Sequence, residues 1–266
     1  MSFADLDRLR VYYERGGDPD GPRLLFFNGT GGDLRTQPSA LTWPIAQGFD
    51  FVAFDQRGLG QTDKPEGPYE MADYAADAIQ LMDHLGWSSC RVIGISFGGM
   101  VAQEVAVTVP ERIERLALCC TSSGGAGGAS YPLHELRDLE PLEERVARHV
   151  ELANEQFSRE WQAAHPDMVK LFSERGRDIE PGSDADRGAR LQLDARSRHD
   201  VYDRLPRITC PTLVASGRGD GIAPPANGQA IAAQIEGSEY AEFDGGHLFF
   251  ALDQSAWPMI TSFLRQ

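Results

Sequence analysis

A single serine between closely spaced glycines constrains the fold of this chain more than any other feature. Residues 91–95 are mostly apolar and predict a short buried strand, and residues 100–106 have the apolar content of a packed helix. Ser96 stands between these elements, with Gly94 and Gly98 two residues away on either side. A turn that passes directly from strand to helix leaves little room for side chains at the flanking positions. The segment therefore predicts a sharp turn that holds Ser96 in a strained backbone conformation.

The same spacing is typical of a turn that presents a nucleophilic serine. Such a turn lifts the hydroxyl clear of the sheet, and the helix N-terminus beneath it favours developing negative charge. Glycine and serine are common residues, so a plain glycine-rich turn packed against a neighbour is the alternative interpretation. The strand before Ser96 and the helix after it favour the nucleophile.

Strands and helices are expected to alternate along most of the chain. Apolar runs that predict strands occur at residues 24–27, 49–55, 113–120, 211–216 and 239–243, with an edge strand expected at 9–14. Helical spacing occurs at residues 71–85, 225–235 and 254–264. This alternation predicts an α/β fold with a parallel sheet that is covered by helices on both faces. In such sheets the functional loops lie at the carboxyl ends of the strands.

The alternation breaks after the glycine-rich residues 124–128. Residues 133–205 show no strand-like run and much helical patterning, with loop signals at Pro166, Gly176 and Pro181. We therefore divide the chain into an α/β core of residues 1–128 and 206–266 and a helical insertion of residues 129–205.

A serine hydroxyl is a poor nucleophile until a base removes its proton. His247 directly follows the strand expected at 239–243, which places it in a loop at the functional edge of the sheet. Of the other five histidines, His84 lies in an expected helix and four lie in the insertion. We assign the base to His247 and keep His199, in the insertion, as a candidate for the substrate pocket.

An imidazole base needs an acid that fixes its tautomer. Asp220 follows the strand expected at 211–216, and it completes the order Ser96, Asp220, His247 that this type of triad takes. Asp244 lies three residues before His247 and is the rival acid. Its expected role is to form the turn.

The tetrahedral intermediate of acyl transfer also needs two hydrogen-bond donors for its oxyanion. The residue after the nucleophile supplies one backbone N–H group, which here belongs to Phe97. The loop of residues 28–32 supplies the other, for which we choose Thr30 with Gly29 as the alternative. Asn28 begins this loop and is a second candidate for the substrate pocket.

Together these motifs resemble the α/β-hydrolase superfamily. The residues that carry the resemblance are 28–32, 55–60, 94–99, 217–220 and 245–247, which occur in the expected order along nearly the whole chain. The resemblance implies a mostly parallel sheet of the eight-stranded type, and it implies that the helical insertion is a cap over the substrate pocket. It implies no metal and no organic cofactor.

Finer features look like 3-oxoadipate enol-lactonases and cofactor-free bromoperoxidase or perhydrolase-like esterases. These features are Asp55-x-Arg57-Gly58-x-Gly60, residues 67–69 and residues 112–119. The resemblance implies hydrolysis of a small carboxylic ester or lactone through an acyl-enzyme. Hydrolysis of a C–C bond in a diketone-type acid and perhydrolysis are alternatives that use the same residues. A catalytically silent ligand-binding protein is the non-enzymatic alternative.

The net charge and the cysteine content indicate which partners and which cellular compartment to expect. Lysine and arginine total 25 and aspartate and glutamate total 40, so the formal net charge is −15. That charge argues against nucleic acid and anionic membrane surfaces as partners and leaves a small molecule as the expected one. The sequence shows no signal peptide and no apolar run of transmembrane length. The four cysteines have no metal-type spacing and are expected to be reduced thiols in a cytoplasmic protein: Cys90, Cys119, Cys120 and Cys210.

The sequence leaves the substrate and the oligomeric state open. A substrate with a carboxylate would need a cation in the insertion. The candidates considered for that cation are Arg145, Arg148, Arg159, Arg175 and Arg177, whose default role is solvated helix surface.

Overall fold

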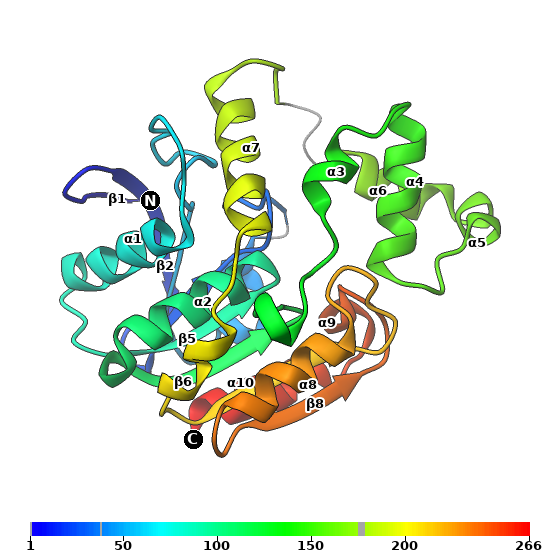
Figure 1. Cartoon of the computed structure of the whole chain (residues 1–266). Coiled ribbons are helices and arrows are strands. Elements are labelled where there is room, and N and C mark those ends of the chain that lie inside the picture. Colours follow the sequence, from blue (N-terminus) through cyan, green and yellow to red (C-terminus); the bar gives the residue numbers. More distant parts are fainter. Residues whose placement is uncertain (1, 38, 175–178) are drawn as a thin grey trace.

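A sheet of eight strands forms the centre of the computed structural model, which describes residues 2–37, 39–174 and 179–266 (Figure 1). The strands are ordered β1-β2-β4-β3-β5-β6-β7-β8. β2 pairs antiparallel with β1 and β4, and the pairs from β4–β3 to β7–β8 are parallel. The strands are β1 (Ser2–Asp5), β2 (Arg10–Gly17), β3 (Arg23–Phe27), β4 (Asp50–Phe54), β5 (Cys90–Ile95), β6 (Ile113–Cys119), β7 (Thr212–Gly217) and β8 (Glu239–Phe243). The predicted α/β fold with a mostly parallel sheet is confirmed.

Helices cover both faces of the sheet because successive residues of its buried strands point to opposite sides. In β5, Val92 belongs to a hydrophobic cluster that includes residues of α1 (Met71–His84), α2 (Phe97–Thr108) and α8 (Pro225–Gln234). Ile93 belongs to a second cluster that includes residues of α9 (Phe249–Leu252) and α10 (Ala256–Arg265). Short 3₁₀ helices join these elements: η1 (Ala40–Thr42), η2 (Pro44–Ala46), η3 (Pro110–Arg112), η4 (Gly125–Gly127) and η5 (Tyr202–Arg207).

The sequence prediction was wrong at the N-terminal side of the sheet. β1 at Ser2–Asp5 is the edge strand, and β2, expected to be the edge, lies between β1 and β4. β1 has four residues, of which only Ala4 is buried, so it has too few apolar positions for a periodic signal. Helix α9 was missed because its four residues are too few for a helical period to show.

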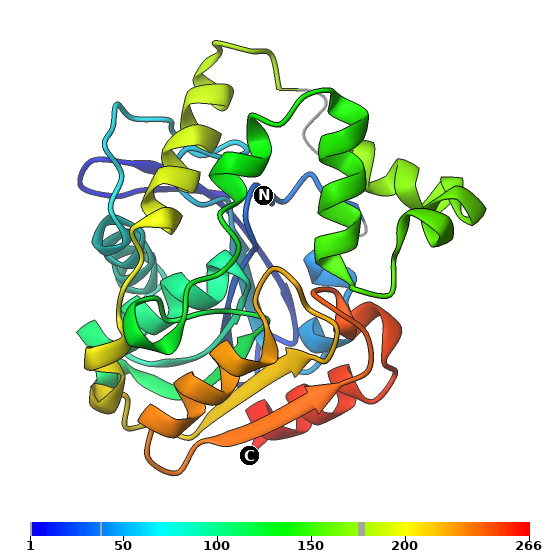
Figure 2. The ribbon, with the colours of Figure 1, turned by 45° about the vertical axis from the view of Figure 1, so that its right-hand side comes forward.

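The helices between β6 and β7 lie together on one side of the core, as Figures 1 and 2 show. They are α3 (Leu133–Arg137), α4 (Leu142–Ala153), α5 (Arg159–Ala164), α6 (Pro166–Glu174) and α7 (Asp184–Ser197). Backbone hydrogen bonds join the end of α4 to the core, with Gly221 N–H donating to Leu152 and His247 N–H donating to Ala153. The helices fall within residues 129–205, and the division into core and cap at those boundaries stays a prediction.

Candidate active site

The turn between β5 and α2 holds Ser96 at φ 55° and ψ −118°. This positive φ confirms the strained backbone that the glycine spacing predicts. A Cβ atom on Gly94 would lie 2.3 Å from the carbonyl oxygen of Gly98, and one on Gly98 would lie 2.2 Å from that of Phe27. The turn is therefore closed to side chains at both flanking positions.

Gly98→Ala is expected to lower the free energy of unfolding by about 3 kcal/mol or more, because the new methyl group meets rigid backbone. Gly86→Ala is the matched control, since Gly86 has φ +69° and open space around its Cβ position. That control should cost only about 1 kcal/mol, from its positive φ. Urea denaturation of both variants measures the difference. Equal losses would show that close packing at Gly98 is not the cause.

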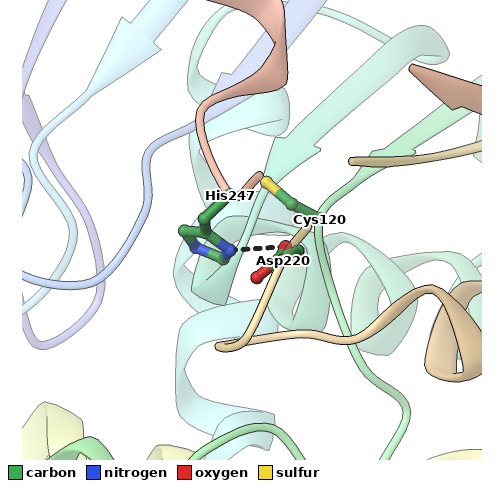
Figure 3. Close-up of side chains that lie close together, drawn as sticks. All are labelled: Cys120, Asp220 and His247. Carbon is green, nitrogen blue, oxygen red and sulfur yellow. Dashed lines mark hydrogen bonds and ion pairs between the residues drawn. The ribbon is translucent and has the colours of Figure 1, made fainter. Parts of the chain in front are cut away.

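The structure brings together the three residues proposed as a triad. His247 Nε2 lies 2.9 Å from Ser96 Oγ, and His247 Nδ1 lies 2.8 Å from Asp220 Oδ2 (the latter contact is dashed in Figure 3). Asp220 Oδ1 also accepts hydrogen bonds from the N–H groups of Ile222 and Ala223, each at 2.8 Å. A carboxylate so held accepts the Nδ1 proton, which leaves Nε2 free to accept the proton of Ser96.

The rival acid lies elsewhere. Asp244 is exposed and pairs with Arg218, while its N–H donates to Asp253 at 2.9 Å. The expectation that Asp244 belongs to the turn is consistent with these contacts, and Asp220 is the carboxylate that meets His247.

Cys120 lies beside the triad, which the sequence did not indicate. Its Sγ atom, a carboxylate oxygen of Asp220 and a ring nitrogen of His247 are within 4.8 Å of one another (Figure 3). Burial and the nearby Asp220 charge hold the pKa of the Cys120 thiol well above its usual value. A protonated thiol is a poor metal ligand, and the Asp220 carboxylate is already engaged by His247. These contacts give no support to a metal centre here.

The loop of residues 28–32 passes Ser96 at Gly29, and three of its four N–H groups after Asn28 are occupied. The N–H of Gly29 donates to Asn28 Oδ1 at 2.9 Å, that of Gly31 donates to Gln192 Oε1 at 2.8 Å, and that of Gly32 donates to the Gly29 carbonyl at 3.1 Å. Within the described chain the N–H of Thr30 has no such partner. This pattern favours Thr30 over Gly29 as the oxyanion donor. The N–H of Phe97, the first residue of α2, has no intrahelical acceptor, as is general at a helix start.

Asp55 connects the segment that follows this loop to the turn after β4. Its Oδ1 accepts from the Leu34 N–H and its Oδ2 from the Gln61 N–H, both at 2.7 Å. Burial raises the pKa of Asp55 to about 6, although these two hydrogen bonds oppose the shift. The raised pKa means that the folded protein binds this proton more tightly than the unfolded chain does, so the resulting stability is lost as the pH rises through 6.

Lowering the pH from 8 to 5 should therefore stabilise the wild type relative to Asp55→Asn by about 1.4 kcal/mol, because the variant lacks this titration. Urea denaturation of both proteins at the two pH values measures the change. An unchanged difference between them would contradict the raised pKa of Asp55.

The two pocket candidates have different environments. Asn28 is partly exposed, and its carbonyl oxygen accepts from Gln56 Nε2 at 2.8 Å. His199 is buried next to Ser122. Burial first, and then the charges of Arg204 and Arg196, lower the pKa of His199 to about 3, so its ring is neutral at ordinary pH. Their roles in substrate binding stay predictions.

The cap arginines considered from the sequence do not mark a site. Arg159 pairs with Glu144 and Glu151, and Arg148 also pairs with Glu151. Arg145 donates to the carbonyl of Arg137. The remaining two candidates, Arg175 and Arg177, lie outside the described residues.

Sequence reasoning missed two buried polar residues of α7, Gln192 and Arg196. Glutamine and arginine side chains are mostly exposed in proteins, whereas these two are buried. Composition and spacing therefore gave no signal for them.

None of the helices described here is long and apolar enough to cross a membrane.

A family model described as "alpha/beta hydrolase fold" matches residues 22–254. The poly(3-hydroxyalkanoate) depolymerase of Ectopseudomonas oleovorans is 29% identical over 95% of this chain and 87% of its own. 3-Oxoadipate enol-lactonase 2 of Acinetobacter baylyi is 27% identical over 90% of this chain and 87% of its own. A putative non-heme bromoperoxidase of Mycobacterium tuberculosis is also similar. The enol-lactonase of Burkholderia xenovorans LB400 superposes with a TM-score of 0.82 at 24% identity, over 100% of both chains, a likeness that shows the fold.

Proposed function

Because the chain belongs to the α/β-hydrolase fold family, we propose that it is a serine hydrolase that cleaves a small carboxylic ester or lactone. The predicted resemblance to this superfamily and to enol-lactonases is confirmed. The observation that carries the proposal is the continuous hydrogen-bonded path from Ser96 through His247 to Asp220. An enol-lactonase among the relatives supports the class of substrate.

In the proposed reaction, Ser96 Oγ attacks the substrate carbonyl carbon while His247 Nε2 takes the hydroxyl proton. The carbonyl oxygen becomes an oxyanion that accepts hydrogen bonds from the N–H groups of Thr30 and Phe97. The C–O bond to the leaving group then breaks, and His247 returns the proton to the departing oxygen. Asp220 keeps the imidazole in its tautomer and stabilises its charged form.

The resulting acyl-enzyme is hydrolysed by the same groups. A water molecule loses a proton to His247 and attacks the acyl carbon, and the Ser96 oxygen leaves with that proton. The products are a carboxylic acid and the free enzyme. For a lactone, alcohol and acid remain in one molecule.

Labelling with a fluorophosphonate tests whether Ser96 is activated at all. One adduct per chain is expected, and peptide mass spectrometry should place it on Ser96. His247→Ala should label far more slowly, because the base is gone. A folded protein that forms no adduct would contradict the proposal and favour a ligand-binding protein with this fold.

Hydrolysis of a short-chain p-nitrophenyl ester and of a small lactone then tests the reaction. Cleavage of either substrate with Ser96-dependent kinetics supports the proposal. Labelling accompanied by turnover of diketone-type acids alone would instead assign C–C bond hydrolysis. A cytoplasmic location forms part of the proposal, supported by four buried, free cysteines.

A further inference from the structure

One face of α7 carries buried polar side chains that the proposed mechanism does not use. Gln192, Arg196 and His199 are spaced four and three residues apart, so they share one face of α7 and of the turn after it. Their exposed fractions are 0%, 4% and 7%. Arginine is almost never buried to this extent unless it is paired.

The guanidinium group of Arg196 is only partly satisfied. Its Nη1 donates to the carbonyl of Tyr131 at 2.7 Å, but Nε and Nη2 are buried and reach no acceptor in residues 2–37, 39–174 and 179–266. Nε2 of Gln192 is likewise buried without an acceptor in that part of the chain. Buried donors without acceptors are costly, and charged ones most of all.

The charge of Arg196 has little compensation from the protein. No carboxylate of the described residues forms an ion pair with it. Among the described residues, the charge that favours its positive form is that of Asp220, and the Asp220 oxygens are already engaged by His247, Ile222 and Ala223. Burial lowers the pKa of Arg196 to about 10, so the group is still positive at neutral pH.

The position of this face connects it to the candidate active site. Gln192 Oε1 accepts from the N–H of Gly31, next to the proposed oxyanion donor Thr30. Arg196 lies near enough to Asp220 for their charges to interact. The face therefore runs from the loop of residues 28–32 toward Asp220. It belongs to the helices between β6 and β7, which Figure 2 shows on one side of the core.

We propose that Arg196 and Gln192 form a subsite for a carboxylate group on the substrate. This inference rests on the proposed function, because it names the substrate class of the same site: esters or lactones of acids that carry a second carboxylate. The two unpaired atoms, Nε and Nη2, form one edge of the guanidinium, and that edge matches the two oxygens of a carboxylate. Anchoring of Nη1 at Tyr131 fixes the orientation of this edge, and Gln192 Nε2 adds another donor.

A pair of p-nitrophenyl esters that differ in one group tests the subsite. The first is the monoester of glutaric acid, and the second is its glutaramate analogue, in which a neutral amide replaces the carboxylate. The wild type is expected to have the higher kcat/KM on the acid. Arg196→Met should lower kcat/KM on the acid roughly 100-fold and change that on the amide less than about threefold.

Two further variants control for charge and for folding. Arg159→Met removes an exposed cap arginine and should leave both substrates unaffected. Arg196→Lys keeps the charge without the bidentate edge, so it should recover part of the preference for the acid. Equal losses on both substrates in Arg196→Met, or no preference in the wild type, would overturn the subsite. Equal losses would show that Arg196 acts through Asp220 instead.

Glutarate binding separates this inference from the proposed function. Glutarate should raise the Tm of Ser96→Ala and should not raise the Tm of the Ser96→Ala/Arg196→Met double variant. If the wild type binds glutarate but is not labelled by a fluorophosphonate, the carboxylate subsite is supported and the hydrolase proposal is rejected. Labelling of Ser96 without glutarate binding or acid preference would keep the hydrolase and reject the subsite.

Discussion

Replacing Ser96 by alanine is expected to lower the kcat of ester hydrolysis by roughly 10⁵- to 10⁶-fold. The variant lacks the oxygen that forms the acyl-enzyme, and no other hydroxyl lies within hydrogen-bond distance of His247 Nε2 in the part of the chain described. The residual rate should come from the oxyanion donors and from substrate binding alone. Hydrolysis of a p-nitrophenyl ester by both proteins, at equal concentration of folded enzyme, measures the effect.

Ser123→Ala is the matched control for that experiment. Ser123 is a buried serine that follows the neighbouring strand β6, and its hydroxyl donates only to the carbonyl of Gly124. Its loss should change kcat less than about threefold, as expected for a residue outside the reaction. A Ser96→Ala enzyme that retains a tenth of the wild-type rate would rule out Ser96 as the nucleophile.

Asp220→Asn is expected to lower kcat by roughly 10⁴-fold with little change in fold. The Oδ1 position can still accept from the N–H groups of Ile222 and Ala223, so the amide nitrogen should face His247. An amide donates to Nδ1 where the carboxylate accepted from it, which moves the ring proton to Nε2. Nε2 then cannot take the proton of Ser96.

Asp244→Asn serves as the control, because Asp244 is the acid nearest to His247 in sequence. Its exposed pair with Arg218 contributes little, so both activity and stability should change only slightly. Rates are compared across pH 6–9, because a shifted tautomer cannot be restored by raising the pH. A large loss in Asp244→Asn together with a wild-type rate in Asp220→Asn would exchange the two roles.

Most regular elements could be predicted from the sequence because their periodic signals are long. α1 begins at Met71 as predicted and ends within one residue of the prediction, before Gly86 at φ +69°. β8 has the predicted bounds, Glu239–Phe243. The strand and helix around Ser96 follow from a motif that is sterically demanding over a few residues. Short elements such as β1 carry too few residues for any periodic pattern, and only pairing with β2 reveals them.

Contacts between residues far apart in the sequence were harder to predict than the identity of the candidate site residues. Loop position and chain order selected Asp220 over Asp244, and the hydrogen bond to His247 agrees with that choice. The choice between Thr30 and Gly29 depended on which N–H groups were already occupied. The N–H of Gly29 donates to the side chain of the preceding residue, Asn28, once the loop has folded. The N–H of Gly31 is occupied by Gln192 from 161 residues away, and no local pattern encodes that contact.

The fold family, the order of the strongly patterned elements and the residues proposed for the triad could all be predicted from the sequence. This was possible because buried strands, helices and a glycine-flanked turn each impose local steric or periodic rules. Which polar atoms remain unpaired became clear from the folded chain. Among the described residues, folding left the Thr30 N–H unpaired in the loop that passes Ser96, and it buried two donors of Arg196 without acceptors. Hydrogen-bond satisfaction is a property of the whole packed chain, so a site defined by unsatisfied donors appears only after folding.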